Sequence, residues 1–169
     1  MTKFLLAVHV IAAIIAVGPV TVAASMFPPA ARKVLDAPDG ADALATTRLL
    51  HRICQVYAVV GVVVPVFGFA TANSMGVLGD TWLIVSIALT ALAAVVLGAL
   101  VLPRQSAILQ SLTPENLTSE NLTSEGLTPQ GTGGRAATVR LAMFTGIFNL
   151  LWATVTVLMI IRPGSTTGA

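Results

Sequence analysis

Hydrophobic positions along the chain gather into four long runs that contain no Lys, Arg, Asp or Glu. The runs are Phe4–Phe27, Ile53–Ala72, Trp82–Leu102 and Leu141–Ile161. An α-helix of about 20 residues, rising ~1.5 Å per residue, crosses a hydrocarbon layer ~30 Å thick. The pattern therefore predicts an all-α membrane protein, in which residues 1–169 form a single antiparallel bundle of four transmembrane helices.

The composition agrees with this prediction. The chain is 56% hydrophobic and only 9% charged, whereas charged residues make up about a quarter of a typical soluble protein. The basic residues lie near the ends of the apolar runs, where they set membrane orientation and contact lipid headgroups. We therefore expect the lipid bilayer as a partner, and no nucleic acid. The single cysteine, Cys54, excludes an internal disulfide and a multi-thiolate metal site in one copy.

The distribution of Lys and Arg predicts the orientation. Lys3 and Arg162 lie on one side of the membrane. The other seven basic residues lie on the opposite side: Arg32, Lys33, Arg48, Arg52, Arg104, Arg135 and Arg140. Because cytoplasmic loops carry the excess of positive charge, the first and third loops should be cytoplasmic and both termini non-cytoplasmic. This is the arrangement expected of a multi-pass protein of the bacterial cytoplasmic (inner) membrane.

Two sequence features define the predicted loops. Pro28-Pro29 should end the first helix, because proline removes a backbone donor and restricts the residue before it. The third loop, residues 105–135, contains a pentad repeat, with copies such as Leu117–Glu120 and Leu122–Glu125. A period of five fits neither a helix nor a strand, so a flexible cytoplasmic loop is predicted there.

Small residues recur every three or four positions in each run and predict the faces that pack helix against helix. The four stripes are His51, Cys54, Ala58, Gly61, Pro65, Gly68 and Ala72; His9, Ala12, Ala13, Ala16, Val20 and Ala23; Ser86, Thr90, Ala94 and Gly98; and Ala142, Thr145, Gly146, Asn149, Ala153 and Thr156. Gly61 and Gly68 should allow close helix approach. Asn149 should hydrogen-bond to another helix, and Pro19 and Pro65 should bend theirs.

The sharpest candidate site is His9, a residue within the first run. A neutral imidazole at this depth can ligate haem b, copper or another metal; alternatively, it forms a hydrogen bond with a neighbouring helix. His51 lies near the start of the second run, at the opposite membrane face. The two histidines should thus be on the order of 20 Å apart, which excludes a haem held by both in one bundle.

A second candidate is a basic rim that could bind an anionic lipid headgroup or another anionic ligand; its alternative is ordinary membrane anchoring. The rim comprises Arg48, His51, Arg52, Arg104 and Arg140. The sequence contains no catalytic triad, phosphate-binding loop or paired carboxylates within the runs, so no catalytic residues are predicted.

Several segments carry a family resemblance: Lys3–His9, Arg48–Arg52, Val64–Gly68, and Trp82 through Pro103-Arg104. They resemble a family of bacterial integral membrane proteins of unknown function. That family is distantly similar to the CopD-like copper-resistance proteins and to the HemJ-type protoporphyrinogen oxidases, which are four-span haem proteins. The second similarity implies that His9 corresponds to the first-span histidine. The oxidase family's tryptophan before the span-1 glycine and its span-3 lysine are absent, so its activity is not inferred.

These observations leave two functional hypotheses. The first is a non-enzymatic, helix-packing protein that self-associates or serves as an accessory subunit of a membrane complex. The second is a membrane redox protein that binds haem or copper through His9. The sequence leaves the ligand, the partner and the oligomeric state open.

The orientation can be tested with a reporter fused after Ala169. An alkaline phosphatase fusion, which is active only outside the cytoplasm, should be active, and a fusion in the first loop should be inactive. The opposite pair of activities would contradict the charge argument.

Overall fold

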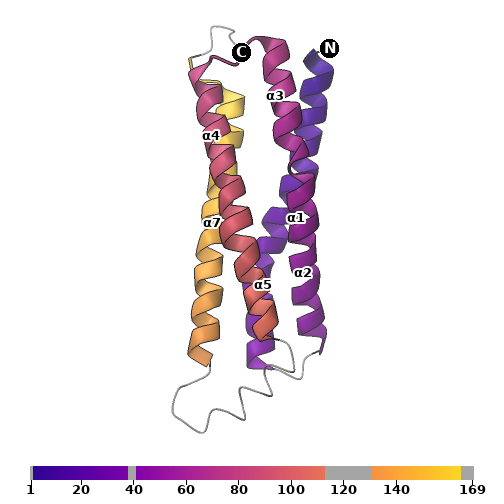
Figure 1. Cartoon of the computed structure of the whole chain (residues 1–169), viewed down its shortest axis with the longest axis vertical. Helices are drawn as coiled ribbons and strands as arrows, with labels where there is room; N and C mark the ends of the chain where they lie inside the picture. The colour runs from indigo at the N-terminus through magenta and orange to yellow at the C-terminus, as the bar shows by residue number, and fades with distance from the viewer. Residues whose placement is uncertain (1, 38–40, 113–130, 165–169) are drawn as a thin grey trace.

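The structure is a computed structural model that describes residues 2–37, 41–112 and 131–164. Every element in these ranges is helical (Figure 1). The elements are α1 (Thr2–Asp36), α2 (Ala41–Val60), α3 (Val63–Met75), α4 (Thr81–Val95), the π-helix η1 (Val96–Val101), α5 (Leu102–Ser111) and α7 (Gly131–Ile161).

The elements combine into four helices that are long and apolar enough to cross a membrane. They are Thr2–Asp36, Ala41–Met75, Thr81–Ser111 and Gly133–Ile161, of 35, 35, 31 and 29 residues. A membrane crossing needs about 20 residues, so each helix is longer than the hydrocarbon layer requires. The described part of the chain is therefore that of an all-helical, multi-pass membrane protein.

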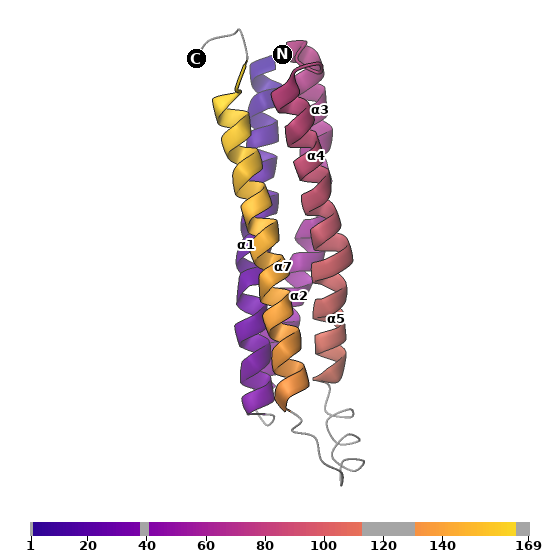
Figure 2. The ribbon, with the colours of Figure 1, turned by 90° about the vertical axis from the view of Figure 1, so that its left-hand side faces the viewer.

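Contacts between distant segments define how the helices lie beside one another. α1 begins and α7 ends at the same end of the bundle, which also holds the turn from α3 to α4 (Figures 1 and 2). There Met159 packs near the buried Trp82. At the other end, Asp36 at the end of α1 accepts a hydrogen bond from Arg135 near the start of α7.

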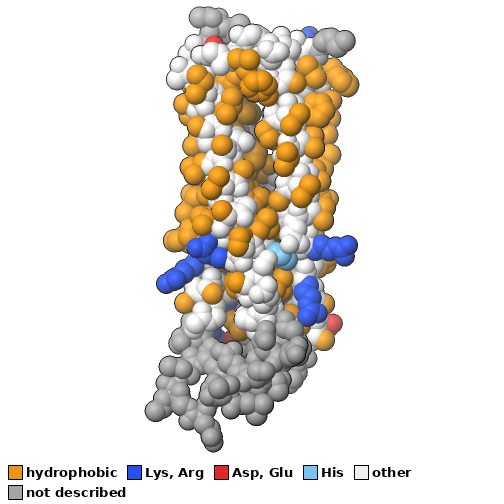
Figure 3. Space-filling view, viewed as in Figure 1, with side chains coloured by type: hydrophobic (Ala, Val, Ile, Leu, Met, Phe, Trp, Pro, Cys, Tyr) orange, Lys and Arg blue, Asp and Glu red, His pale blue; other side chains and the backbone are white. Residues whose placement is uncertain are grey.

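The helical segments at that other end, 28–36, 41–52, 103–111 and 133–140, lie outside the predicted apolar runs; we call them the basic end. Figure 3 shows Lys and Arg side chains gathered below the apolar band of the bundle. The core nevertheless continues into the basic end, where Val34, Leu50 and Ile108 are buried. Because these segments lie outside the apolar band, we attribute their packing to the hydrophobic effect in water.

Two predicted boundaries differ from the structure. α1 does not end at Pro28-Pro29 but continues through both prolines to Asp36. Pro28 is itself buried, and packing against the neighbouring helices offsets the lost backbone hydrogen bonds. The predicted loop 105–135 is helical at both ends, because α5 extends to Ser111 and α7 begins at Gly131. The repeat copies 117–120 and 122–125 lie outside the described residues.

The second membrane-crossing helix is interrupted between α2 and α3. The break falls at Gly61-Val62, four residues before Pro65, where the proline ring conflicts with the carbonyl of residue i−4. The Val64 N–H donates to the Gly61 carbonyl oxygen at 3.2 Å. A Cβ on Gly61 would lie 3.2 Å from the carbonyl oxygens of Tyr57 and Ala58. Gly61 therefore serves the bend that Pro65 imposes rather than contact with another helix.

The predicted packing face of the third run is wrong at two of its four positions. Ser86 is buried, but Ala94 and Gly98 are exposed. The buried positions are instead Ala93, Leu97, Val101 and Gln105, which are spaced by four. An α-helix over-rotates by about 40° with each such step, and the wider π turn compensates. η1 thus keeps one face of the helix inward as far as α5.

The other predicted faces are confirmed in part. On α1, His9, Ala16, Val20 and Ala23 are buried, whereas Phe4, Ile11 and Ile15 are exposed. On α2 and α3, Cys54 and Ala72 are buried and Pro65 is exposed. On α7 the prediction is largely wrong, since only Thr145 of the stripe is fully buried. The exposed stripe residues are Ala142, Gly146, Ala153 and Thr156.

Substitution at an alanine of the α1 face should test this packing. Ala31 is fully buried, so Ala31→Leu should overfill the core and lower the unfolding free energy by about 1–3 kcal/mol. Ala99→Leu, at an exposed position, is the matched control and should be neutral. Reversible unfolding in mixed micelles with dodecyl sulfate measures the unfolding free energy of both variants. Equal unfolding free energies for Ala31→Leu and Ala99→Leu would contradict the burial of Ala31.

Candidate functional site

His9 lies in the contact between α1 and α3 and is 7% exposed. Its Nδ1 is 3.0 Å from the carbonyl oxygen of Val64. A carbonyl only accepts hydrogen bonds, so Nδ1 carries the proton and donates it. The ring also lies against Gly68, where a Cβ would come within 2.8 Å of His9 Cε1. Gly68 therefore provides the space that the imidazole occupies.

His51 lies between α2 and α5, in a network of polar side chains at the basic end. Its Nδ1 is 2.9 Å from Gln105 Oε1, and its Nε2 is 3.3 Å from Ser106 Oγ. Gln105 is fully buried, and its amide donates to Cys54 Sγ at 3.6 Å. Both imidazole nitrogens thus have partners within the bundle. His51 therefore has partners of its own, although Arg48 and Arg52 lie close to it on the same helix.

Gln105 is the residue that the sequence analysis missed. It lies three residues beyond Leu102, the end of the third apolar run, where polar side chains are expected to face water or lipid headgroups. Its spacing of four residues from Val101 indicates burial only once the π-helix is known, so the sequence alone offers no signal for it. Burial of its amide is favourable because both ends of the group have partners, His51 and Cys54.

The arginines of the rim occupy two different settings. Arg48 and Arg52 are exposed on α2. Arg104 of α5 extends across to α7, where its guanidinium lies 4.3 Å from the centre of the Phe144 ring. Its Nη1 also donates to the Leu100 carbonyl oxygen at 3.0 Å. Arg140, one helical turn from Phe144, is exposed, and the structure gives it no hydrogen bond or ion pair with the described residues.

A further polar group lies at the contact between α1 and α7. Asn149 Nδ2 donates to Ser25 Oγ at 3.1 Å, which confirms the predicted interhelical hydrogen bond. Two buried oxygens, Asn149 Oδ1 and Thr145 Oγ1, have no hydrogen-bond partner within the described part of the chain. Gly146 lies between them in sequence, is exposed, and has no atom within 4 Å of an ideal Cβ.

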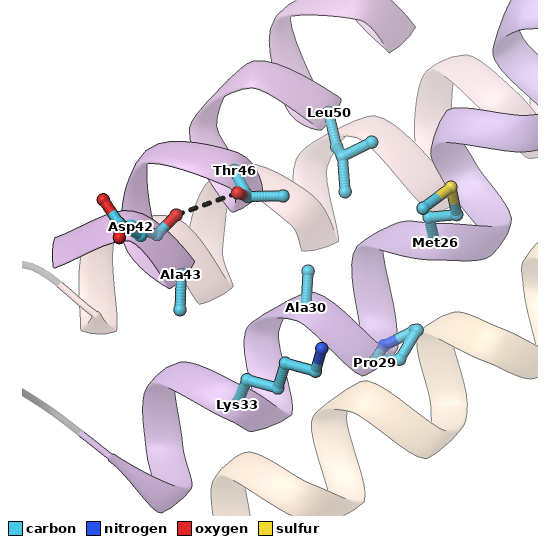
Figure 4. Close-up of a pocket in the computed structure, with 8 residues that line it drawn as sticks. All are labelled: Met26, Pro29, Ala30, Lys33, Asp42, Ala43, Thr46 and Leu50. Atoms are coloured by element: carbon cyan, nitrogen blue, oxygen red, sulfur yellow. Dashed lines mark hydrogen bonds between the residues drawn. The ribbon is translucent and has the colours of Figure 1, made fainter. Parts of the chain in front are cut away.

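Two pockets lie at the basic end. The larger pocket, of about 370 Å³, lies between α1 and α2 (Figure 4). Its lining residues are Met26, Pro29, Ala30 and Lys33 of α1, and Asp42, Ala43, Thr46 and Leu50 of α2. The walls are mostly apolar, and the single amine and single carboxylate give it no net charge. The smaller, of about 170 Å³, lies between α5 and α7 and is lined by Arg104, Ala107, Ile108, Ala137 and Arg140.

The described residues include no group of three or more His, Cys, Asp or Glu side chains placed to hold a metal ion. His9 forms a hydrogen bond with the Val64 carbonyl. Val64 and His51 belong to the same membrane-crossing helix and are 13 residues apart. At ~1.5 Å per residue, that separation is about 20 Å. The two histidines belong to separate sites.

Comparisons with protein-family models, with curated proteins and with solved structures gave no match to this chain.

The fit of His9 against Gly68 predicts an asymmetry between glycines. Gly68→Ala should push the imidazole away from Val64 and lower the unfolding free energy by about 1–3 kcal/mol, as overpacking does. Gly98→Ala is the matched control, since no atom lies within 4 Å of its ideal Cβ. It should be neutral or slightly stabilising.

Unfolding of both variants in mixed micelles provides the comparison. Equal loss of stability in Gly68→Ala and Gly98→Ala would contradict the proposed contact between His9 and Gly68.

Proposed function

We propose that the chain is a non-enzymatic membrane protein that self-associates through the exposed face of α7. The observation that carries this proposal is the combination of small residues and an unpaired polar atom on that helix. Ala142, Gly146 and Ala153 are exposed, and the buried Asn149 Oδ1 lacks a hydrogen-bond partner among the described residues. Small residues let membrane helices approach closely, and polar side chains then hydrogen-bond across the contact.

The unpaired, buried oxygen of Asn149, next to the exposed small residues, distinguishes α7 from the other helices that expose small residues. α4 and η1 also expose small residues, Ala94 and Gly98, but the neighbouring hydroxyl of Thr90 already donates to the Ser86 carbonyl. In lipid, an amide oxygen without a partner is costly. The Thr156 hydroxyl cannot be the donor, because it already donates to the Trp152 carbonyl oxygen. Because Asn149 Oδ1 is buried within one copy, we propose that this side chain rotates toward the exposed small residues on association and accepts from the amide N–H of the other Asn149. This favours a dimer related by a two-fold axis.

Orientation and location form part of the same proposal. All seven basic residues of the cytoplasmic loops predicted from the sequence fall within the basic end: Arg32, Lys33, Arg48, Arg52, Arg104, Arg135 and Arg140. We therefore assign the basic end to the cytoplasmic side of a bacterial inner membrane, with antiparallel helices and both termini outside.

A second candidate function, haem or copper binding at His9, is favoured by one observation. Nδ1 of metal-ligating histidines commonly donates to a backbone carbonyl, as Nδ1 of His9 does to Val64. This bond leaves Nε2 unprotonated, which is the form that ligates a metal. The described residues offer no partner for Nε2, so the ligand atom is free. Haem or copper bound there would supply one-electron redox chemistry.

Self-association should be lost in Gly146→Leu. Because this position is open in the monomer, the leucine should block the α7 contact without disturbing the bundle. Sedimentation equilibrium in a density-matched detergent should give a dimer for the wild type and a monomer for the variant. Gly98→Leu is the matched control and should remain a dimer. A monomeric wild type, or dissociation by Gly98→Leu alone, would contradict the assignment to α7.

Haem binding at His9 predicts an absorption band near 400 nm in the purified protein, and copper binding predicts stoichiometric copper in metal analysis. Either signal should disappear in His9→Ala. Gln105→Ala, which alters the separate site around His51, should leave it unchanged. A colourless, metal-free preparation from haem- and copper-supplemented cells would exclude this function.

A further inference from the structure

The pocket between α5 and α7 has the composition of an anion site. Two guanidinium groups, Arg104 and Arg140, line it together with Ala107, Ile108 and Ala137. No acidic side chain lines it, in contrast to the larger pocket, where Asp42 accompanies Lys33. Of the described acids, Asp36 pairs with Arg135, and Asp80 lies at the opposite end of the bundle, beside Trp82.

The two guanidinium groups are brought together by α7. Phe144 and Arg140 are four residues apart and therefore lie on the same side of that helix. The Arg104 guanidinium lies 4.3 Å from the centre of the Phe144 ring, so it is held about one helical turn from Arg140. The Leu100 carbonyl takes only one of its five N–H donors. Both groups thus retain donors for an anion, and two arginines can bind the oxygens of one phosphate.

The position and size of the pocket indicate which anion it takes. Arg104 follows the third apolar run and Arg140 precedes the fourth, so both lie at the boundary between hydrocarbon and water. The volume of about 170 Å³ equals roughly five or six molecules of liquid water, enough for a phosphate and its nearest substituents. Ala107 and Ala137, one turn further into the basic end, leave room for those substituents beside the phosphate.

We propose that this pocket binds the phosphodiester headgroup of an anionic membrane phospholipid, with Arg104 and Arg140 contacting the phosphate. The acyl chains would follow the apolar surface of the bundle on the hydrocarbon side of the two arginines. This binding does not depend on the self-association or on a cofactor at His9, because neither the α7 stripe nor His9 lines the pocket.

The test is native mass spectrometry of the full chain, released from a neutral detergent after incubation with equal amounts of phosphatidylglycerol and phosphatidylcholine. The wild type should retain phosphatidylglycerol preferentially. Arg140→Gln should weaken that retention about tenfold or more, as expected for loss of a hydrogen bond to a charged group. The exposed Arg140 has no partner among the described residues, so this variant should fold normally. The double variant Arg104→Gln/Arg140→Gln should abolish the preference.

Two controls distinguish lipid binding in this pocket from attraction of the lipid by the net charge of the protein. Arg48→Gln/Arg52→Gln removes the same charge from an exposed pair on α2 and should keep the preference. Ala137→Leu fills the pocket without changing any charge and should lower the preference, whereas Ala136→Leu, at an exposed position outside the pocket, should not.

Three results would overturn the proposal. The first is an equal loss in the two double arginine variants, which would mean attraction by net charge alone. The second is unchanged lipid retention in Ala137→Leu. The third is displacement of phosphatidylglycerol by inorganic phosphate at the same concentration, which would make the pocket a site for a free phosphate rather than for a lipid.

Discussion

The close approach of other helices to the alanine-rich face of α1 holds the structure together. Ala16, Ala23, Ala24 and Ala31 are almost completely buried, and α1 packs against α2, α3, α5 and α7. Within lipid there is no hydrophobic force between helices, so van der Waals contact between closely spaced backbones must supply the attraction. Outside the apolar band, larger side chains such as Val34, Leu50 and Ile108 extend the same core. One helix therefore organises the bundle in two different solvents.

Much of this arrangement could be predicted from the sequence. The absence of charge from four long runs identifies the four helices, and the spacing of small residues identifies the buried face of α1. The π-helix η1 could not be predicted, because it depends on how α4 and α5 pack on their neighbours. Ala94 precedes η1 and is exposed because the four-residue spacing from Ser86 through Thr90 over-rotates an α-helix, which leaves Ala93 on the buried face instead. The continuation of α1 through Pro28 and Pro29 also depends on tertiary packing, which offsets what local preference disfavours.

The candidate sites were predictable to different degrees. His9 was identified because an ionisable side chain within an apolar run is unusual, yet its fit against Gly68 required the three-dimensional pairing of α1 with α3. The pairing of His51 with Gln105 was not foreseen, because Gln105 lies beyond the third apolar run and its inward orientation depends on η1. The exposed small residues of α7 were predicted to lie in the interior. Their exposure is what turns a packing feature into a candidate contact with a second copy.

The central claim, that two copies meet along α7, is tested most directly by cysteine cross-linking in native membranes. The only native cysteine, Cys54, is buried, so it provides a low background. Under mild oxidation, Gly146→Cys should give a disulfide-linked dimer in high yield, and Val59→Cys, at an exposed position on α2, should remain monomeric. Equal yields at the two positions, or a dimer from Val59→Cys alone, would contradict the account.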